Sequence, residues 1–159
     1  MNQTTQGLES VLAQHRFFRE LRPDHVKLLA GCAKNVVFQP GEYLFRQGQD
    51  ADALYVIREG LISLELSAAG KGTIVIATAG SDEVVGWSWM VSPHRWRYSG
   101  KATQLTRAVA VDGKCLRGKC DDDHDLGYSL LWEVVRILAH RLEATRIQLL
   151  DVYGSEGKG

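Results

Sequence analysis

The sequence predicts a mainly β domain with helices before and after it. Between residues 36 and 112, about eight short apolar segments alternate with turn signals such as Pro40-Gly41 and Glu59-Gly60. This spacing is typical of a barrel, a sandwich or a jelly roll. Sixteen glycines against three prolines in 159 residues also fit many tight turns between strands. A chain of this length forms one domain of ordinary size.

Two helices are expected before the strands. Residues 8–21 carry apolar side chains at roughly helical spacing. Pro23 followed by Asp24 is a helix-start signal, because proline suits the first helical position and an acid suits the first turn. We expect this second helix to end near Lys34, so that residues 1–35 form an N-terminal tail with helices.

The strand segment covers residues 36–112. Apolar and polar residues partly alternate along 61–66, and 73–78 is rich in β-branched residues, as expected of strands. Residues 101–111 also have strand character, and glycines mark the turns between the segments.

Helical character returns in residues 113–153. Asp112 precedes a short helix over 113–119, and a long helix is predicted from about 124 to 152. Its apolar residues recur at alternating steps of four and three, with Thr145 in the same row, and we call this row the seam: Leu131, Val135, Leu138, Leu142 and Leu149. The helix either packs on its own domain or pairs with a second copy, and the heptad-like spacing favours a homodimer. Residues 154–159 are predicted to be a flexible tail.

Charge and targeting signals exclude several classes of protein. Nineteen basic residues balance nineteen acidic ones, which argues against nucleic-acid binding through bulk charge. The N-terminus lacks the basic and apolar regions of a signal peptide, and no apolar run is long enough to span a membrane. Three cysteines, at 32, 115 and 120, suit a reducing compartment better than a disulfide framework. We therefore expect a cytoplasmic protein without a direct membrane or nucleic-acid partner.

The first strands resemble a known family. The run from Val37 to Gly48, VFQPGEYLFRQG, is similar to the opening of a cyclic-nucleotide-binding domain of the catabolite activator superfamily. The run from Leu54 to Ile62, LYVIREGLI, continues that pattern in register, and the resemblance covers about residues 8–152. It implies an eight-stranded, jelly-roll-like β-roll (a double-stranded β-helix) with N-terminal helices and a long C-terminal helix that commonly pairs two subunits.

The resemblance also implies a ligand site after the sixth strand. In the family, a phosphate-binding cassette reads Gly-Glu, a helical turn, and then an arginine followed by small residues. Backbone N–H groups and the arginine hold the cyclic phosphate, and the glutamate accepts a hydrogen bond from the ribose hydroxyl. The corresponding segment here is 86–99, with Gly86 in place. Trp87 stands at the glutamate position and cannot accept that hydrogen bond.

Arg95 and Arg97 both lie near the arginine position, and the spacing does not decide between them. Ser99 can offer a hydroxyl to a phosphate, and Ser88 completes the predicted ligand-binding set. Three of the four tryptophans fall between 87 and 96. Either the site is remodelled, with an arginine on an anion and a tryptophan stacked on a flat group, or tryptophans 87 and 89 fill the old pocket as core side chains.

The sequence predicts a non-catalytic ligand sensor or regulatory domain. The candidate ligand at Gly86–Ser99 is a cyclic nucleotide, cyclic AMP or cyclic GMP, or another small anion. A helix-turn-helix follows the long helix in DNA-binding members, whereas this chain ends there. The alternatives are a ligand-free module that binds a protein partner, with its pocket filled by tryptophan, and a transcription regulator that acts through a separate DNA-binding partner.

Other residue patterns carry weaker signals. Cys115, Cys120 and His124 have a Cys-x4-Cys-x3-His spacing, but this is not a common zinc pattern and we predict no metal site. Cys115 can equally pack as a small hydrophobe. Ser88 lacks the flanking glycines of a nucleophile elbow, and the sequence contains no P-loop or dinucleotide fingerprint. We therefore expect no enzyme activity.

Overall fold

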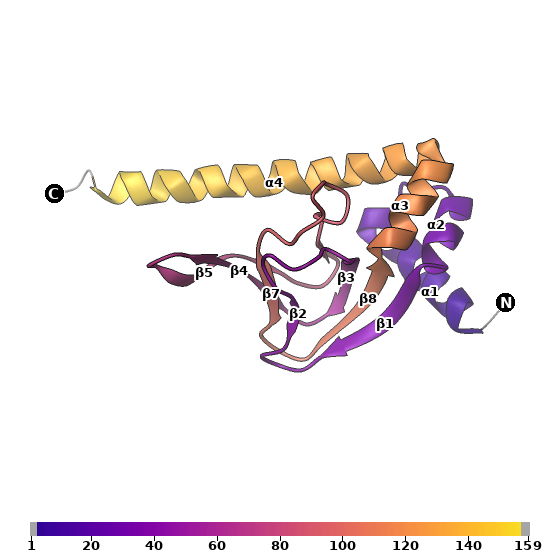
Figure 1. The fold of residues 1–159 in the computed structure, drawn as a ribbon, viewed down its shortest axis with the longest axis horizontal. Helices are drawn as coiled ribbons and strands as arrows, with labels where there is room; N and C mark the ends of the chain where they lie inside the picture. Colours follow the sequence, from indigo (N-terminus) through magenta and orange to yellow (C-terminus); the bar gives the residue numbers. More distant parts are fainter. Residues whose placement is uncertain (1–2, 157–159) are drawn as a thin grey trace.

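The computed structural model describes residues 3–156, and it confirms a mainly β domain with flanking helices (Figure 1). Helices come first and last: α1 (Gln3–Gln14), the short 3-10 helix η1 (Arg16–Phe18), α2 (Pro23–Ala30), α3 (Gly113–Asp122) and α4 (His124–Glu156). The helix predicted over 8–21 is divided, because His15 has an extended backbone. Its side chain accepts a hydrogen bond from the Phe17 N–H and so caps η1.

Eight antiparallel strands form two four-stranded sheets: β1 (Ala33–Phe38), β2 (Tyr43–Phe45), β3 (Ala53–Glu59), β4 (Ile62–Ala68), β5 (Gly72–Ala79), β6 (Val84–Val85), β7 (Ser99–Ala102) and β8 (Thr106–Asp112). The first sheet has the order β1-β8-β3-β6 and the second β2-β7-β4-β5. This arrangement confirms the jelly-roll-like β-roll. Residues 101–111, predicted to have continuous strand character, belong to two strands, because the chain crosses from the second sheet to the first after Ala102.

The core has two parts, one on each face of the first sheet. Leu54 and Val56 of β3 pack among the helices, whereas Tyr55 and Ile57 point into the interior of the roll. Five consecutive residues of β3 are buried for this reason. The strand therefore reads as a continuous apolar run in the sequence rather than as an alternating one.

Helix α4 runs along one side of the roll and past the β4–β5 hairpin (Figure 1). Its first turns are held by Leu126, Leu130 and Val134, which are buried in the helical part of the core. Most of the seam is exposed on the described chain: Leu131, Val135, Leu142 and Leu149 are 49%, 43%, 53% and 50% exposed. A second copy covering the seam remains a prediction.

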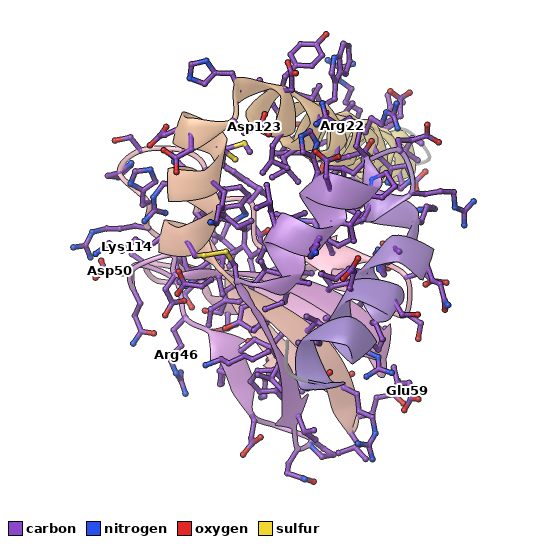
Figure 2. All side chains as sticks on the ribbon, turned by 90° about the vertical axis from the view of Figure 1, so that its right-hand side faces the viewer. Arg22, Arg46, Asp50, Glu59, Lys114 and Asp123 are labelled. Atoms are coloured by element: carbon purple, nitrogen blue, oxygen red, sulfur yellow. A yellow bond between two sulfur atoms is a disulfide. The ribbon has the colours of Figure 1, made fainter. Side chains whose placement is uncertain are left out.

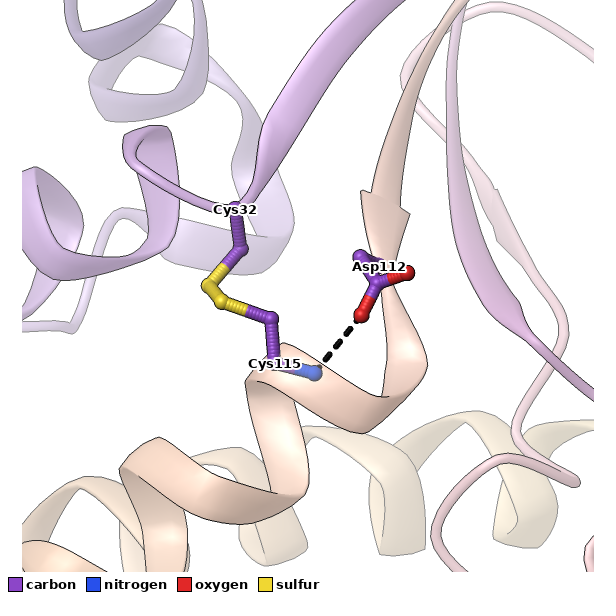
Figure 3. The surroundings of a disulfide bond; sticks show 3 residues. All are labelled: Cys32, Asp112 and Cys115. Carbon is purple, nitrogen blue, oxygen red and sulfur yellow. Dashed lines mark hydrogen bonds between the residues drawn. A yellow bond between two sulfur atoms is a disulfide. The ribbon is translucent and has the colours of Figure 1, made fainter.

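A disulfide joins Cys32, between α2 and β1, to Cys115 in the first turn of α3 (Figure 3). Cys120 is free. The interpretation of the three cysteines as thiols rather than disulfide partners is wrong for this pair, because pairing depends on distance in space and not on an even count. Cys115 therefore does not serve as a simple core hydrophobe or as a free ligand for a metal.

Candidate functional site

The predicted cassette is the irregular segment between β6 and β7. It begins at Gly86, whose φ of +94° is a conformation that residues with a side chain rarely adopt. A Cβ at this position would lie 2.7 Å from Cη2 of Trp96 and 3.0 Å from the Ala53 carbonyl oxygen. After Gly86 the chain makes a turn, in which the Met90 N–H donates to the Trp87 carbonyl at 3.0 Å. Gly86 therefore has a steric as well as a conformational role.

The tryptophans divide between the two parts of the core. Trp89 is buried among the helices, where Arg117 of α3 donates to its carbonyl oxygen at 2.7 Å. Trp96 lies in the roll interior, is 3% exposed and stacks on Phe45 with ring centroids 3.9 Å apart. Of the two tryptophans expected to fill the pocket, Trp89 lies outside the roll and Trp87 is only partly buried. Trp96 is the tryptophan that fills space directly beneath Gly86.

The two cassette arginines have different surroundings. Arg95 donates to the Gly48 carbonyl oxygen at 2.8 Å and lies 3.5 Å from the Asp50 carboxylate. Arg97 makes no hydrogen bond or ion pair with any residue in the described range 3–156. Its guanidinium lies 5.7 Å from the ring centroid of Trp87, so the two side chains form a cationic and aromatic surface. Arg97 is thus the cassette arginine whose charge is available to an anion.

The two predicted serines also differ. The Ser99 Oγ accepts a hydrogen bond from the Gln47 N–H at 2.9 Å, which holds the start of β7 against the loop after β2. The Ser88 Oγ is buried and has no hydrogen-bond partner among the described residues. A buried hydroxyl without a partner is uncommon, because its desolvation is not offset. Of the predicted site residues, the structure places the Arg97 guanidinium beside Trp87, and it leaves Ser99 engaged with the scaffold.

Arg141 of α4 contacts both ends of the cassette, and no sequence pattern singles it out. Its guanidinium donates to the Tyr98 hydroxyl at 2.9 Å and to the Val84 carbonyl oxygen at 3.3 Å. Val84 precedes Gly86, and Tyr98 follows Arg97. The only available signal was a position on the long helix outside the seam, which does not distinguish Arg141 from a solvated charge.

Residues 3–156 contain neither a cluster of metal ligands nor a membrane-spanning helix. No group of three or more histidine, cysteine, aspartate or glutamate side chains within them is arranged to hold a metal ion. No helix in the described part of the chain is long and apolar enough to cross a membrane.

Comparisons with known proteins agree with this architecture. The family model for the cyclic nucleotide-binding domain matches residues 35–123. A CRP-like cAMP-activated global transcriptional regulator of Mycobacterium tuberculosis is 25% identical over 152 residues, which cover 96% of this chain and 66% of the regulator. The chain thus spans just under two thirds of the length of that relative.

Solved structures share the fold. A putative cyclic nucleotide-binding protein from Geobacter metallireducens matches with a TM-score of 0.75 and 25% identity, covering 89% of this chain and 99% of that chain. The regulatory domain of Toxoplasma gondii PKA, crystallised with cAMP, matches with a TM-score of 0.73 and 15% identity, covering 86% of this chain and 50% of that chain. Because the family model also matches more than half of its residues, the chain belongs to the cyclic nucleotide-binding domain family.

Proposed function

We propose that this regulatory domain binds a cyclic nucleotide, cyclic AMP or cyclic GMP, at the cassette Gly86–Ser99, and that it does so without catalysis. The observation that carries the proposal is the unpaired Arg97 guanidinium beside the exposed part of the Trp87 ring. A guanidinium can hold a phosphate through two parallel hydrogen bonds. The buried Ser88 hydroxyl, without a partner among the described residues, adds a donor in the same segment.

Ligand binding is expected to act on α4. Arg141 connects this helix to Val84 and Tyr98, at the two ends of the cassette. A ligand that draws Arg97 inward would shift Tyr98, its neighbour in the chain, and so favour one position of α4 over another. The name of the Mycobacterium tuberculosis relative, which is cAMP-activated, supports a regulatory output of this kind.

Calorimetry with cyclic AMP and cyclic GMP tests the proposal. We expect measurable heat with at least one of them, and a loss of roughly tenfold or more in affinity for Arg97→Ala, since a charge-assisted hydrogen bond contributes about 1.5–3 kcal/mol. Arg95→Ala is the matched control, because Arg95 is already engaged by Gly48 and Asp50. Absence of heat with both nucleotides would refute cyclic-nucleotide binding, and equal losses for the two variants would refute the role of Arg97.

A second candidate function is that of a ligand-free interaction module. The packing of Trp96 beneath Gly86 favours it, since this ring occupies interior space of the roll. Such a module would show no rise in melting temperature with a broad set of anionic metabolites, whereas a sensor would show one. Solved structures with Trp96 in the same position before and after soaking with cyclic nucleotide would favour the module.

We also propose that α4 pairs with α4 of a second copy through the seam. The helix has 33 residues and so is roughly 50 Å long, which extends it well beyond its buried first turns. Leu149→Glu should shift the protein to monomer in sedimentation velocity, because it places a charge in the seam. Ile147→Glu is the control, since a residue two positions away on a helix faces the opposite side. A monomeric wild-type protein would refute the pairing.

A further inference from the structure

The disulfide links two distant parts of the chain at the base of α3. Cys32 and Cys115 are 83 residues apart, and the bond ties the end of the N-terminal helices to the helix that leads into α4. We propose that Cys32–Cys115 is a reversible redox site, which a dithiol reductant opens and an oxidised thiol closes while the protein stays folded.

The fold itself places the two sulfur atoms together. Ala33, next to Cys32, pairs with Val111 in the β1–β8 ladder, and the Asp112 N–H donates to the Cys32 carbonyl oxygen at 2.9 Å. Asp112 then caps α3 by accepting a hydrogen bond from the Cys115 N–H at 2.7 Å (Figure 3). None of these contacts requires the sulfur–sulfur bond. The two thiols of the reduced protein therefore stay at high effective concentration, which favours closure of the bond again.

The bond is also accessible. Both cysteines are half-buried, and both line a cleft of about 470 Å³ formed by β1, β3, β8 and the start of α3. Lys34, Asp52 and Asp112 contribute polar groups to this cleft, and Phe38 and Tyr55 contribute apolar ones. Thiol–disulfide exchange requires a thiolate to reach a disulfide sulfur, so a disulfide that borders a cleft can react without unfolding of the core.

A dithiol reduces the disulfide in two steps. One thiolate of the reductant attacks a sulfur of the protein disulfide, forms a mixed disulfide and releases the other cysteine as a thiolate, which takes a proton from water. The second thiolate of the reductant then attacks the other reductant sulfur, which is bonded to the protein in the mixed disulfide. This attack releases the remaining cysteine as a thiolate. Two electrons pass from the dithiol to the protein, and the reductant leaves as a cyclic disulfide. In closure, one protein thiolate attacks oxidised glutathione and releases one glutathione thiolate; the other protein thiolate then attacks the protein sulfur of the mixed disulfide and releases the second, so two electrons pass from the protein to glutathione.

The third cysteine is a weak competitor. Cys120 lies on α3, five residues after Cys115, and is half-buried against the helical core. Burial raises the pKa of the Cys120 thiol, and the nearby carboxylates of Asp121 and Asp123 raise it further. Little of this thiol is therefore ionised at neutral pH, and the thiolate is the form that exchanges. Reduction and reoxidation are expected to involve the same pair each time.

Reduction removes the link at the start of α3 and leaves the contacts at its end. The His25 Nε2 lies 3.1 Å from the Asp123 carboxylate, and the Arg22 guanidinium lies 3.8 Å from the Asp125 carboxylate, where α2 meets the start of α4 (Figure 2). Asp123 also accepts hydrogen bonds from the N–H groups of Asp125 and Leu126, and it thereby caps the N-terminus of α4. The reduced protein is thus expected to keep its fold, with a less restrained first turn of α3.

The redox step is carried out in native buffer, and the free thiols are then alkylated in denaturant and counted by mass spectrometry. After equilibration with oxidised glutathione we expect one labelled cysteine, which is Cys120. After dithiothreitol in native buffer we expect three, with unchanged far-UV circular dichroism, and a return to one when oxidised glutathione is restored. Cys120→Ser should change from none to two. The double variant Cys32→Ser/Cys115→Ser should stay at one throughout.

Two results would overturn the proposal. Three labelled cysteines under oxidised glutathione would show that the bond does not form, and a count that stays at one until urea unfolds the protein would show that the bond is structural only. Hydrogen exchange supplies the readout for α3: amides of 113–119 should exchange faster after reduction, and amides of β3 should not. Equal exchange in the two states would refute the effect on α3. No cyclic nucleotide is present, so these results stand apart from the ligand proposal.

Discussion

Removal of the disulfide is expected to lower the free energy of unfolding by about 4.5 kcal/mol. The perturbation is the double variant Cys32→Ser/Cys115→Ser, measured without reductant. The bond spans 83 residues, and in the chain-entropy model the closed loop destabilises the unfolded chain by about 4.5 kcal/mol at 25 °C. With an unfolding entropy of roughly 2.1 cal/mol/K per residue over 159 residues, this corresponds to a fall of about 14 °C in Tm.

Thermal unfolding followed by circular dichroism provides the measurement. The wild-type protein in dithiothreitol should have the same Tm as the double variant, since both lack the disulfide. Cys120→Ser is the matched control and should unfold close to the wild type without reductant, because Cys120 is free. A double variant whose Tm falls by less than about 3 °C, equivalent to roughly 1 kcal/mol, would refute the reasoning. Such a small fall would mean that the wild-type protein lacks the disulfide or that its unfolded chain is compact without it.

Three further results are expected. Gly86→Ala should destabilise the protein by about 1–3 kcal/mol in urea unfolding, because of the φ of +94° and the Trp96 ring 2.7 Å from the new Cβ. Gly118→Ala, on an open face of α3, should not destabilise the protein. Equal losses of stability for the two variants would contradict the steric account of Gly86. Trp87→Ala should weaken cyclic-nucleotide binding roughly fivefold or more, because it removes the ring beside the Arg97 guanidinium, and unchanged calorimetric affinity would contradict a role for this surface. Burial lowers the pKa of His15 below its ordinary 6.5, so its contribution to stability is complete above that pH and is lost as the pH falls below it. The urea midpoint should fall between pH 7.5 and 5.5 for the wild type and less for His15→Asn, which keeps a capping acceptor; parallel pH profiles would exclude this histidine as the cause.

The fold class was predictable from the sequence, whereas the order of the strands in the two sheets was not. Turn signals and β-branched runs are local, so they appeared in the sequence at the right places. The boundaries were less predictable where tertiary contacts decide them. His15 ends α1 by capping the next turn, and the chain leaves the second sheet between Ala102 and Thr106. Neither event follows from hydrophobic periodicity.

The candidate site shows the same division. The resemblance to the family located the cassette at Gly86 with two nearby arginines, but the spacing did not choose between Arg95 and Arg97. The choice depends on Gly48 and Asp50, more than forty residues away in the chain, which occupy Arg95 and leave Arg97 unpaired. Arg141 was missed because its partners, Val84 and Tyr98, lie in a different part of the sequence.

The sequence by itself determined a glycine-rich β-roll with helices at both ends, because turn chemistry and periodicity are properties of neighbouring residues. The runs 37–48 and 54–62 added a resemblance to cyclic-nucleotide-binding domains. The tertiary structure decided which residues meet across the chain. It placed Trp96 beneath Gly86, brought Cys32 to Cys115, and connected the cassette to α4 through Arg141. These contacts depend on the register of β1 with β8 and on the packing of α4 against the roll, neither of which is encoded in any one segment.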